Sequence, residues 1–428
     1  MLEKQFSEPS VRDRRKVVNG HYCSQKKREY MLSNHDILCF SNMHWDGHMT
    51  CKQQIMLRLA RHNRILYVNR PLSIISPFSG NEEINPWRQF SELSSKPREV
   101  RPNLFVATPP LAMPLRYLQI SNLVNSKILV TWIRKMLRRL DMRSPIVWTY
   151  LPETARVIKS FPKSKSLYHC VDEHSEWGCW WNSQRLVLFR ERELIETVDI
   201  VIATSRNLQS KKVKFNSNCH FVPNAADFEL YSRALDPETQ VPSDLAALPK
   251  PVIGYIGMFS PDHLDIDLVE RAAKKSGYSF VFIGRKIDNS FDLSRLEQCK
   301  NIHFLGFKET TQLPGYLKGI NVGLIPYAKC KRIDAVFPLK LFEYLAAGKP
   351  VVARKTDELN HYSKLISLVE TPQEFLEAIN LSLHEDSPKK VAARVAAARE
   401  NTWDARVKDI SNIIENDLSP NHNTTIYQ

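Results

Sequence analysis

The sequence predicts an α/β protein made of two doubly wound domains, each with a parallel sheet covered by helices on both faces. Three observations carry this prediction. Short apolar runs alternate with helix-period stretches, a polar segment with three prolines interrupts them at 225–250, and the alternation then restarts. Near-continuous apolar strands between amphipathic helices are typical of parallel sheets that are buried on both faces. A length of 428 residues allows two or three domains.

The first domain is expected to span 36–235, after a basic N-terminal arm at 1–35 that we interpret as a solvated tail. Residues 52–62 place Ile55, Met56 and Leu59 on one face of a helix between the first two strands. The predicted strands of this domain are 37–40, 64–69, 104–109, 146–150, 166–171 and 200–205.

The second domain is expected to span 250–400 and to end in a helix at 388–400. Its predicted strands are 251–257, 280–284, 301–306, 322–327 and 349–353. Trp403, Val407 and Ile410 then recur at helical spacing, so the helix at 401–417 must bury an apolar stripe. We expect this helix to cross back to the first domain, with packing on its own domain as the alternative. Residues 418–428 are interpreted as a tail.

Charge and composition restrict the partners and the compartment. Lys and Arg number 60 against 46 Asp and Glu, which gives a net charge of +14 and favours an anionic partner. We find no nucleic-acid-binding module. The eight cysteines form no C-x-x-C pair, the first 18 residues lack the apolar core of a secretory signal, and no apolar run approaches a membrane span. These features predict a protein that is cytoplasmic or peripheral on the inner face of the plasma membrane.

The segment 338–352 carries the strongest signal for chemistry. It reads PLKLFEYLAAGKPVV, in which Pro338 suits a first helical turn and Gly348 suits the left-handed position past the end of a helix. Helices of an open α/β sheet begin at the ligand-binding edge, so Lys340 and Glu343 should face that edge. A carboxylate there can accept both hydroxyls of a ribose, and a lysine can meet a phosphate. A plain Lys–Glu surface pair is the alternative.

This segment resembles the nucleotide-binding signature of family-4 glycosyltransferases, which have the GT-B fold. The likeness is greatest to bacterial enzymes that build teichuronic acid and exopolysaccharides. It continues through PVIGYIG at 251–257, FVFIG at 280–284, NIHFLG at 301–306 and VGLIPY at 322–327. Weaker matches in the first half are HWDG at 44–47, SLYHCVDE at 166–173, DIVIATS at 199–205 and VPNAAD at 222–227.

The resemblance implies a retaining, hexosyl-type glycosyltransferase. Two Rossmann-like domains face a cleft, the first on the acceptor side and the second binding a UDP- or GDP-type sugar donor. The acceptor is a polysaccharide or a lipid-linked glycan at the cytosolic membrane face, and neither a cofactor nor a metal is needed. The donor-nucleotide residues that it implies are Gly254, Gly257, Gly306, Phe307, Pro338, Lys340 and Glu343.

Several positions depart from the family pattern. Many members have a glutamate eight residues before the ribose glutamate, where this chain has Ala335, and Asp334 is the neighbouring carboxylate. The loop at 258–263 lacks the Arg and Lys that often contact the diphosphate. Lys331 and Arg332, together with Lys340 and more distantly Arg285, are the candidates to replace them on the donor sugar or diphosphate.

Three residues of the first half are candidate catalytic groups. Asp172 and His169 lie at the end of a predicted strand, where a carboxylate in a closed site can act as a general base. A strand-end aspartate that caps a helix and a packed histidine are the alternatives. Asp46 follows the first strand and could hydrogen-bond an acceptor, or it could belong to an ordinary loop.

Two further segments have both a structural and a functional interpretation. Residues 127–140 form a basic amphipathic helix that suits an anionic membrane surface, and equally a crossover helix packed on the sheet. Asp265 and Asp267 form a D-x-D sequence, which we interpret as acids at a helix start rather than as metal ligands.

The sequence is also compatible with two other functions. One is a GT-B-fold nucleotide-sugar epimerase, and the other is a catalytically degenerate basic binding subunit, an alternative that the departure at Ala335 keeps open. An NAD-binding Rossmann enzyme is disfavoured, because no G-x-G-x-x-G follows a predicted strand.

Overall fold

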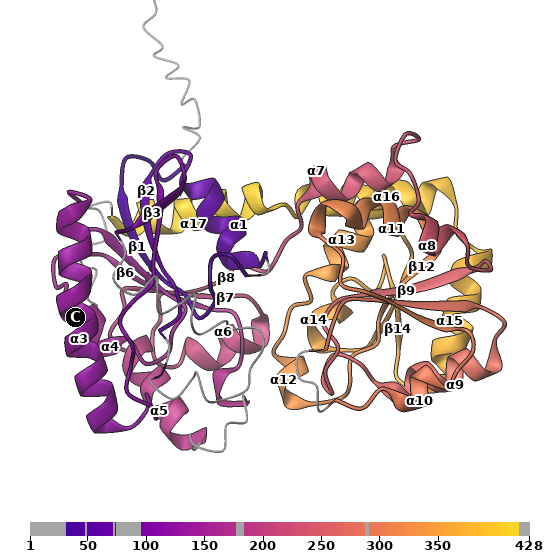
Figure 1. The fold of residues 1–428 in the computed structure, drawn as a ribbon, viewed down its shortest axis with the longest axis horizontal. Coiled ribbons are helices and arrows are strands. Elements are labelled where there is room, and N and C mark those ends of the chain that lie inside the picture. The colour runs from indigo at the N-terminus through magenta and orange to yellow at the C-terminus, as the bar shows by residue number, and fades with distance from the viewer. Residues whose placement is uncertain are drawn as a thin grey trace, which may run out of the picture.

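The computed structural model describes residues 31–47, 49–71, 73, 96–176, 184–286 and 291–418. These residues form two α/β domains, each built on a largely parallel sheet, which confirms the predicted fold class (Figure 1). Most of the predicted arm at 1–35 and nearly all of the predicted tail at 418–428 lie outside the described residues.

The first sheet has the order β3-β4-β2-β1-β5-β6-β7-β8. All of its pairings are parallel except that of β3 with β4. The chain therefore runs from β1 toward one edge and then from β5 toward the other. The strands are β1 Asp36–Phe40, β2 Arg64–Val68, β3 Arg98–Arg101, β4 Leu104–Ala107, β5 Ile146–Thr149, β6 Ser166–Cys170, β7 Ile200–Ala203 and β8 Cys219–Phe221.

Alternating side chains of β1 divide the core of the first domain into two layers. Ile37 and Cys39 face the layer that contains α1 and α17, whereas Leu38 and Phe40 face α3, α4 and α5. This alternation is the two-residue period of a strand that is buried on both faces. The helices of this domain are α1 Cys51–Leu59, α3 Gln119–Arg139, α4 Ala155–Ile158, α5 Gln184–Ile195 and α6 Arg206–Lys212.

The second sheet has the order β11-β10-β9-β12-β13-β14, and all of its pairings are parallel. The strands are β9 Val252–Ile256, β10 Ser279–Ile283, β11 Ile302–Gly306, β12 Val322–Ile325, β13 Val351–Arg354 and β14 Ser367–Val369. One apolar layer packs α9, α10 and α15 against the sheet, and the other packs α7, α11, α13 and α16.

The helices that cover this sheet are α7 Phe228–Tyr231, α8 Ser243–Ala246, α9 Ile266–Lys275, α10 Ser294–Glu297, α11 Leu313–Gly319, α12 Lys331–Asp334, α13 Lys340–Ala346, α14 Asp357–Asn360, α15 Pro372–His384 and α16 Pro388–Glu400. Two details of α13 bear on the prediction. Gly348 has a φ of +70° just past its end, as expected, but the helix begins at Lys340 rather than at Pro338.

The chain changes domain earlier than the predicted residue 235. Ala225 packs in the core of the first domain, whereas Ala226 and Tyr231 pack in the core of the second. The segment expected to be a linker at 225–250 therefore belongs to the second domain, because its apolar side chains, Leu245 among them, are buried there. Polar composition and prolines suggested a linker, but the few apolar residues of this segment decided its position.

The chain returns to the first domain beside the point where it left. Ala226 bridges Thr402, and the Ala226 N–H donates to the Asn401 oxygen at 3.2 Å. Helix α17, Trp403–Leu418, then packs its apolar stripe against α1 (Figure 1), which confirms the predicted crossing helix. Among the described helices, none combines the length and the apolar character needed to span a bilayer.

Candidate active site

Glycines end three neighbouring strands of the second sheet. Gly257 follows β9, Gly284 follows β10, and Gly306 ends β11. Their backbones are joined, since the Gly257 N–H donates to the Ile283 oxygen at 2.9 Å and the Gly284 N–H donates to the Gly306 oxygen at 3.0 Å. A Cβ on Gly284, where φ is +147°, would lie 1.8 Å from the Gly257 oxygen. This row leaves bare backbone at the carboxyl edge of the sheet, where open α/β sheets bind ligands.

Gly254 is placed differently from the other predicted nucleotide-contacting glycines. It lies in the middle of β9 and is buried. A Cβ there would lie 2.3 Å from the side chain of Ile320. Its small size is therefore used for packing inside the second domain.

Lys340 begins α13 and lies directly beside the glycine row. Its ammonium donates to the Tyr327 hydroxyl at 3.2 Å and lies 5.0 Å and 5.2 Å from the ring centroids of Tyr255 and Tyr327. A Cβ on Gly257 would come within 2.8 Å of the Lys340 nitrogen. Two aromatic faces and a hydroxyl thus hold a positive charge next to the half-buried Gly257 backbone.

Glu343 lies one turn further along α13 and contacts α7 of the same domain. The Tyr231 hydroxyl donates to the Glu343 Oε1 atom at 3.1 Å. Burial raises the pKa of Glu343, while the Lys340 charge and the Tyr231 hydrogen bond act in the opposite direction. Tyr231 was not among the residues picked out from the sequence, because nothing in its local pattern marks it.

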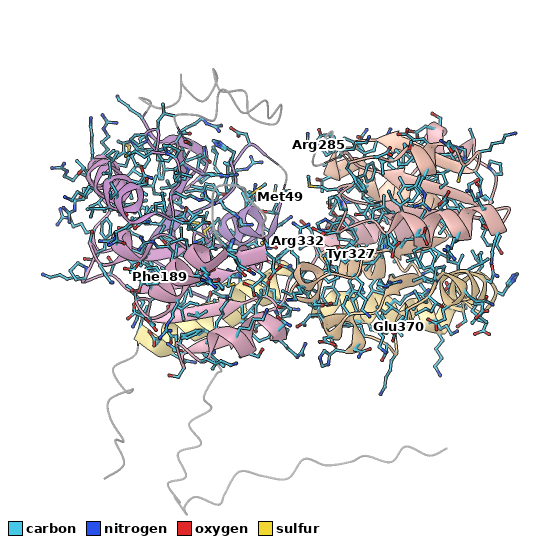
Figure 2. The ribbon with its side chains drawn as sticks, turned by 90° about the horizontal axis from the view of Figure 1, so that it is seen from below. Met49, Phe189, Arg285, Tyr327, Arg332 and Glu370 are labelled. Atoms are coloured by element: carbon cyan, nitrogen blue, oxygen red, sulfur yellow. The ribbon has the colours of Figure 1, made fainter. Side chains whose placement is uncertain are left out.

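Arg332 on α12 lies between the two domains, as Figure 2 shows. It forms an ion pair with Asp262 of the loop after β9. In the same loop the His263 Nδ1 atom lies 2.7 Å from the Ser260 hydroxyl. Burial, with the charges of Lys340 and Arg332, lowers the pKa of His263 to about 3, so this ring is neutral at pH 7.

The remaining charged candidates of this region have different surroundings. Lys331 is exposed and Asp334 is half-buried on α12. The Asp265 side chain caps α9 by accepting from the Leu268 N–H at 3.0 Å. Asp267 pairs with Arg271 at 3.0 Å, so the D-x-D sequence occupies a helix start as expected.

Phe307 extends from the end of the glycine row. Its ring is 48% exposed, and the Arg285 guanidinium lies 5.4 Å from the ring centroid. Arg285 and Tyr327 lie on the side of the second domain that faces the first, with Met49 on the opposite side of the boundary (Figure 2). An exposed aromatic face beside a cation suits the stacking of a flat, electron-rich ring.

The segment 335–337, which includes the departure from the family pattern at Ala335, contacts the first domain. Ala335 is fully buried in the apolar cluster of the first domain that contains Phe40. The Asn224 amide donates to the Phe337 oxygen at 2.9 Å. The position of the family's glutamate is therefore filled in this chain by a small side chain at an apolar contact between the domains.

A second interdomain contact is polar. Glu358 of α14 is 1% exposed and accepts hydrogen bonds from the N–H groups of Arg206 and Asn207, which begin α6 of the first domain. A carboxylate is favoured at a helix start because the free N–H groups there carry partial positive charge. This contact fixes one end of the boundary between the domains.

On the first domain, the structure places His169 in the interior. It is 2% exposed and its ring stacks on Tyr150, with centroids 5.0 Å apart, while the Trp148 ring lies at a tilt to it with centroids 5.7 Å apart. Burial, with the Lys52 charge, lowers the pKa of His169 to about 3. Neither ring nitrogen has a hydrogen-bond partner among the described residues.

Asp172 is half-buried on the loop after β6, and its neighbours fix that loop. Glu173 is buried and accepts from the Lys211 ammonium and the Ser175 hydroxyl, each at 2.9 Å. The adjacent His174 is also buried, and burial lowers its pKa. Of the polar residues at this strand end, Asp172 retains the access to solvent that His169 lacks.

Asp46 lies on an exposed loop away from these groups. Its carboxylate pairs with Arg98 of β3 at 2.7 Å, and 42% of its side chain is exposed. The three first-domain candidates thus have three different settings: a surface ion pair, a buried stack and a strand-end carboxylate. Tyr327 and His263 were missed at the sequence level, although Tyr327 ends the run VGLIPY that carries part of the resemblance.

Comparisons with known proteins find relatives of this chain. Residues 250–385 match the family model described as Glycosyl transferases group 1. TuaH of Bacillus subtilis (strain 168), which is named provisionally as a teichuronic acid biosynthesis glycosyltransferase, is 30% identical over 177 residues. That alignment spans 40% of this chain and 43% of TuaH.

Solved structures resemble nearly the whole chain. Anabaena Alr3699/HepE in complex with UDP-glucose has 16% sequence identity and a TM-score of 0.61, over 90% of this chain and all of HepE. Sucrose-phosphate synthase from Thermosynechococcus elongatus has 16% identity and a TM-score of 0.64, over 90% of this chain and 99% of the synthase. The chain therefore has the GT-B fold of nucleotide-sugar glycosyltransferases, and its second domain is similar to the glycosyl transferases of group 1.

Proposed function

We propose that this protein is a retaining, hexosyl-type glycosyltransferase that moves a sugar from a nucleoside diphosphate to a glycan or lipid-linked acceptor. The observation that carries this proposal is the row of bare backbone at Gly257, Gly284 and Gly306 beside Lys340 and Glu343. Backbone N–H groups at glycines can approach a diphosphate closely, and the lysine adds a fixed positive charge.

Each donor group has a partner in this arrangement. Glu343 would accept the ribose hydroxyls, and its contact with Tyr231 fixes its orientation. Lys340 and Arg332 would neutralise the diphosphate as it leaves, and Phe307 would stack on the base. A UDP-type donor is supported by HepE, which was solved with UDP-glucose and with UDP.

On the acceptor side, Asp172 is the proposed group that contacts the acceptor hydroxyl. It follows β6 at the carboxyl edge of the first sheet, and its loop is held by the ion pair between buried Glu173 and Lys211. The name of TuaH supports an acceptor of the teichuronic acid type.

We place the enzyme on an anionic membrane surface through α3. This 21-residue helix contains five Lys and Arg residues and no Asp or Glu. Its outer face also exposes Ile120, Leu123 and Ile128, by 73%, 39% and 42%. It lies on the side of the first domain away from the second (Figure 1). Basic and apolar side chains on one exposed face are typical of helices that lie in a membrane interface.

A groove beside the basic half of α3 supports the same placement. It has a volume of about 490 Å³ and is lined by Arg134, Arg138 and Lys163 together with Leu137 and Phe161. Binding to vesicles that contain phosphatidylglycerol should weaken when Lys135 and Arg138 are both changed to Glu. Changing Lys275 and Lys300, two exposed residues of the second domain, to Glu alters the net charge equally and should leave binding unchanged.

The donor site is tested by calorimetric titration with UDP, GDP, ADP and CMP. One diphosphate should bind selectively, and Glu343→Gln should weaken it at least tenfold, whereas Glu370→Gln, on an exposed side chain away from the boundary (Figure 2), should not. Binding of none of these nucleotides by folded protein would refute the proposal. Binding without transfer to any acceptor would instead favour a degenerate binding subunit. The anomeric configuration of a transfer product, read by NMR, tests retention.

A further inference from the structure

Lys52 is a buried lysine of the first domain, and no anionic side chain pairs with it in the described part of the chain. It is 5% exposed, and its ammonium lies 5.5 Å from the centroid of the Tyr150 ring. In the described part of the chain that ring is the only partner found for its charge, with neither an ion pair nor a side-chain hydrogen bond. Buried lysines are almost always paired, because removing an ammonium from water costs more than one aromatic contact returns.

The position of Lys52 in the fold is that of a ligand site. It is in the first turn of α1, which follows β1, and Tyr150 comes directly after β5. The Tyr150 N–H donates to the Phe40 oxygen at 2.9 Å, which ties the two strand ends together. The chain runs in opposite directions across the sheet from β1 and from β5. Open α/β sheets bind ligands outside the strand ends at this switch point.

The surroundings of Lys52 favour negative charge. The first turn of α1 contains no acidic residue, so the partial positive charge of the helix start adds to the ammonium. The Tyr150 hydroxyl and the neutral His169 ring are buried without hydrogen-bond partners among the described residues. The positive charge of Lys52 acts to lower the pKa values of Cys51 and His169, in addition to the effects of burial on both groups. Asp172 follows β6, which pairs with β5 in parallel, so this carboxylate and Tyr150 lie at the same edge of the first sheet.

We propose that Lys52 and the start of α1 bind an anionic group, either a phosphate or a carboxylate, of the acceptor substrate. This inference rests on the proposed glycosyl transfer, with the first domain as the acceptor side. Lys52 would hold the anion while Asp172, at the same edge of the sheet, contacts the hydroxyl that receives the sugar. A phosphate would come from a phosphorylated or lipid-linked sugar, and a carboxylate from a uronic acid.

The test measures binding of three matched probes with UDP at saturation. Methyl glucuronide supplies a carboxylate, methyl glucoside 6-phosphate supplies a phosphate, and methyl glucoside is neutral. One anionic probe should bind at least tenfold more tightly than methyl glucoside, and which one does so identifies the source of the anion. Lys52→Met should remove that difference, whereas Lys52→Arg should keep it. Equal binding of the anionic probe by wild type and Lys52→Met overturns the inference.

Two readouts keep this result separate from the proposed function. UDP should bind to the second domain, so its affinity should be unchanged in Lys52→Met. A wild-type protein that binds no nucleotide would refute the proposed transferase function and not the role of Lys52. If Lys52→Met does not fold, acetylation of wild-type lysines with acetic anhydride replaces it. The anionic probe should lower acetylation of Lys52 at least fivefold and leave exposed Lys135 unchanged. Equal acetylation of Lys52 with and without the probe also overturns the inference.

Discussion

Replacing His169 with phenylalanine should make the protein less sensitive to acid. In the folded protein the ring is 2% exposed, stacked on Tyr150, and its nitrogens have no partners among the described residues. A phenyl ring preserves the flat shape and the stacking, and it removes two buried polar atoms whose burial is unfavourable. His169→Phe should therefore be at least as stable as wild type at pH 7.

The size of the pH effect follows from the pKa of His169, which is lowered from 6.5 to about 3 in the folded state. Because the folded pKa lies below the unfolded one, the unfolded chain binds more protons between these values. The unfolding free energy therefore has its full value above pH 6.5 and decreases as the pH falls toward 3. At pH 5, about 1.5 units below the unfolded pKa, this histidine alone should cost about 2 kcal/mol of unfolding free energy.

Urea unfolding of wild type and variant at pH 7 and pH 5 measures this difference. Other buried histidines, such as His174, contribute equally to both proteins and cancel. The loss of unfolding free energy between the two pH values should be about 2 kcal/mol smaller in His169→Phe. His62→Gln, at an exposed position, should follow wild type. An unchanged pH dependence in His169→Phe would refute this reasoning. Abolished sugar transfer in a stable variant would instead support the predicted catalytic role of His169.

Three other changes test the second domain and its boundary. Gly284→Ala should lower the unfolding free energy by about 2 kcal/mol or more in urea titrations, because the new Cβ would clash with the Gly257 oxygen. A variant as stable as wild type would contradict the predicted clash. Glu358→Ala should lower it by about 2 kcal/mol through the lost hydrogen bonds to Arg206 and Asn207, and no change would show that the contact contributes nothing. The nucleotide affinity of wild type should fall as the pH drops toward and below the raised pKa of Glu343, and the fall should begin above the ordinary value of 4.5. Glu343→Gln should show no such pH dependence in the same titration. A wild-type profile as flat as that of the variant would exclude Glu343 as a nucleotide-binding carboxylate.

The predicted fold followed from local pattern, and its errors have a local cause. Strands that are buried on both faces have continuous apolar sequences, so both sheets were predictable. The crossing helix was predictable from its apolar stripe at helical spacing. The boundary near residue 235 was misplaced because Tyr231 and Leu245 look like isolated apolar residues in a polar segment. Only the packing of the second domain gives them a shared core.

The candidate site was predictable where a motif fixes both residue and spacing, as for Lys340 and Glu343 on α13. It was not predictable where the partner comes from a distant part of the chain. Tyr231 reaches Glu343 across 112 positions, and Tyr327 meets Lys340 from the end of another strand. Side chains brought together by a sheet edge carry no common signal along the sequence.

The sequence by itself determined the two-domain α/β architecture, the helix and glycine stop of 338–352, and the positive charge of the molecule. Tertiary structure alone decided which polar groups face solvent and which are enclosed. It buried His169 against Tyr150, left Lys52 without an anionic partner among the described residues, and set Ala335 into the contact between the domains. The reason is physical: periodicity records which face of an element is apolar, whereas burial and charge pairing depend on neighbours that the chain supplies from elsewhere.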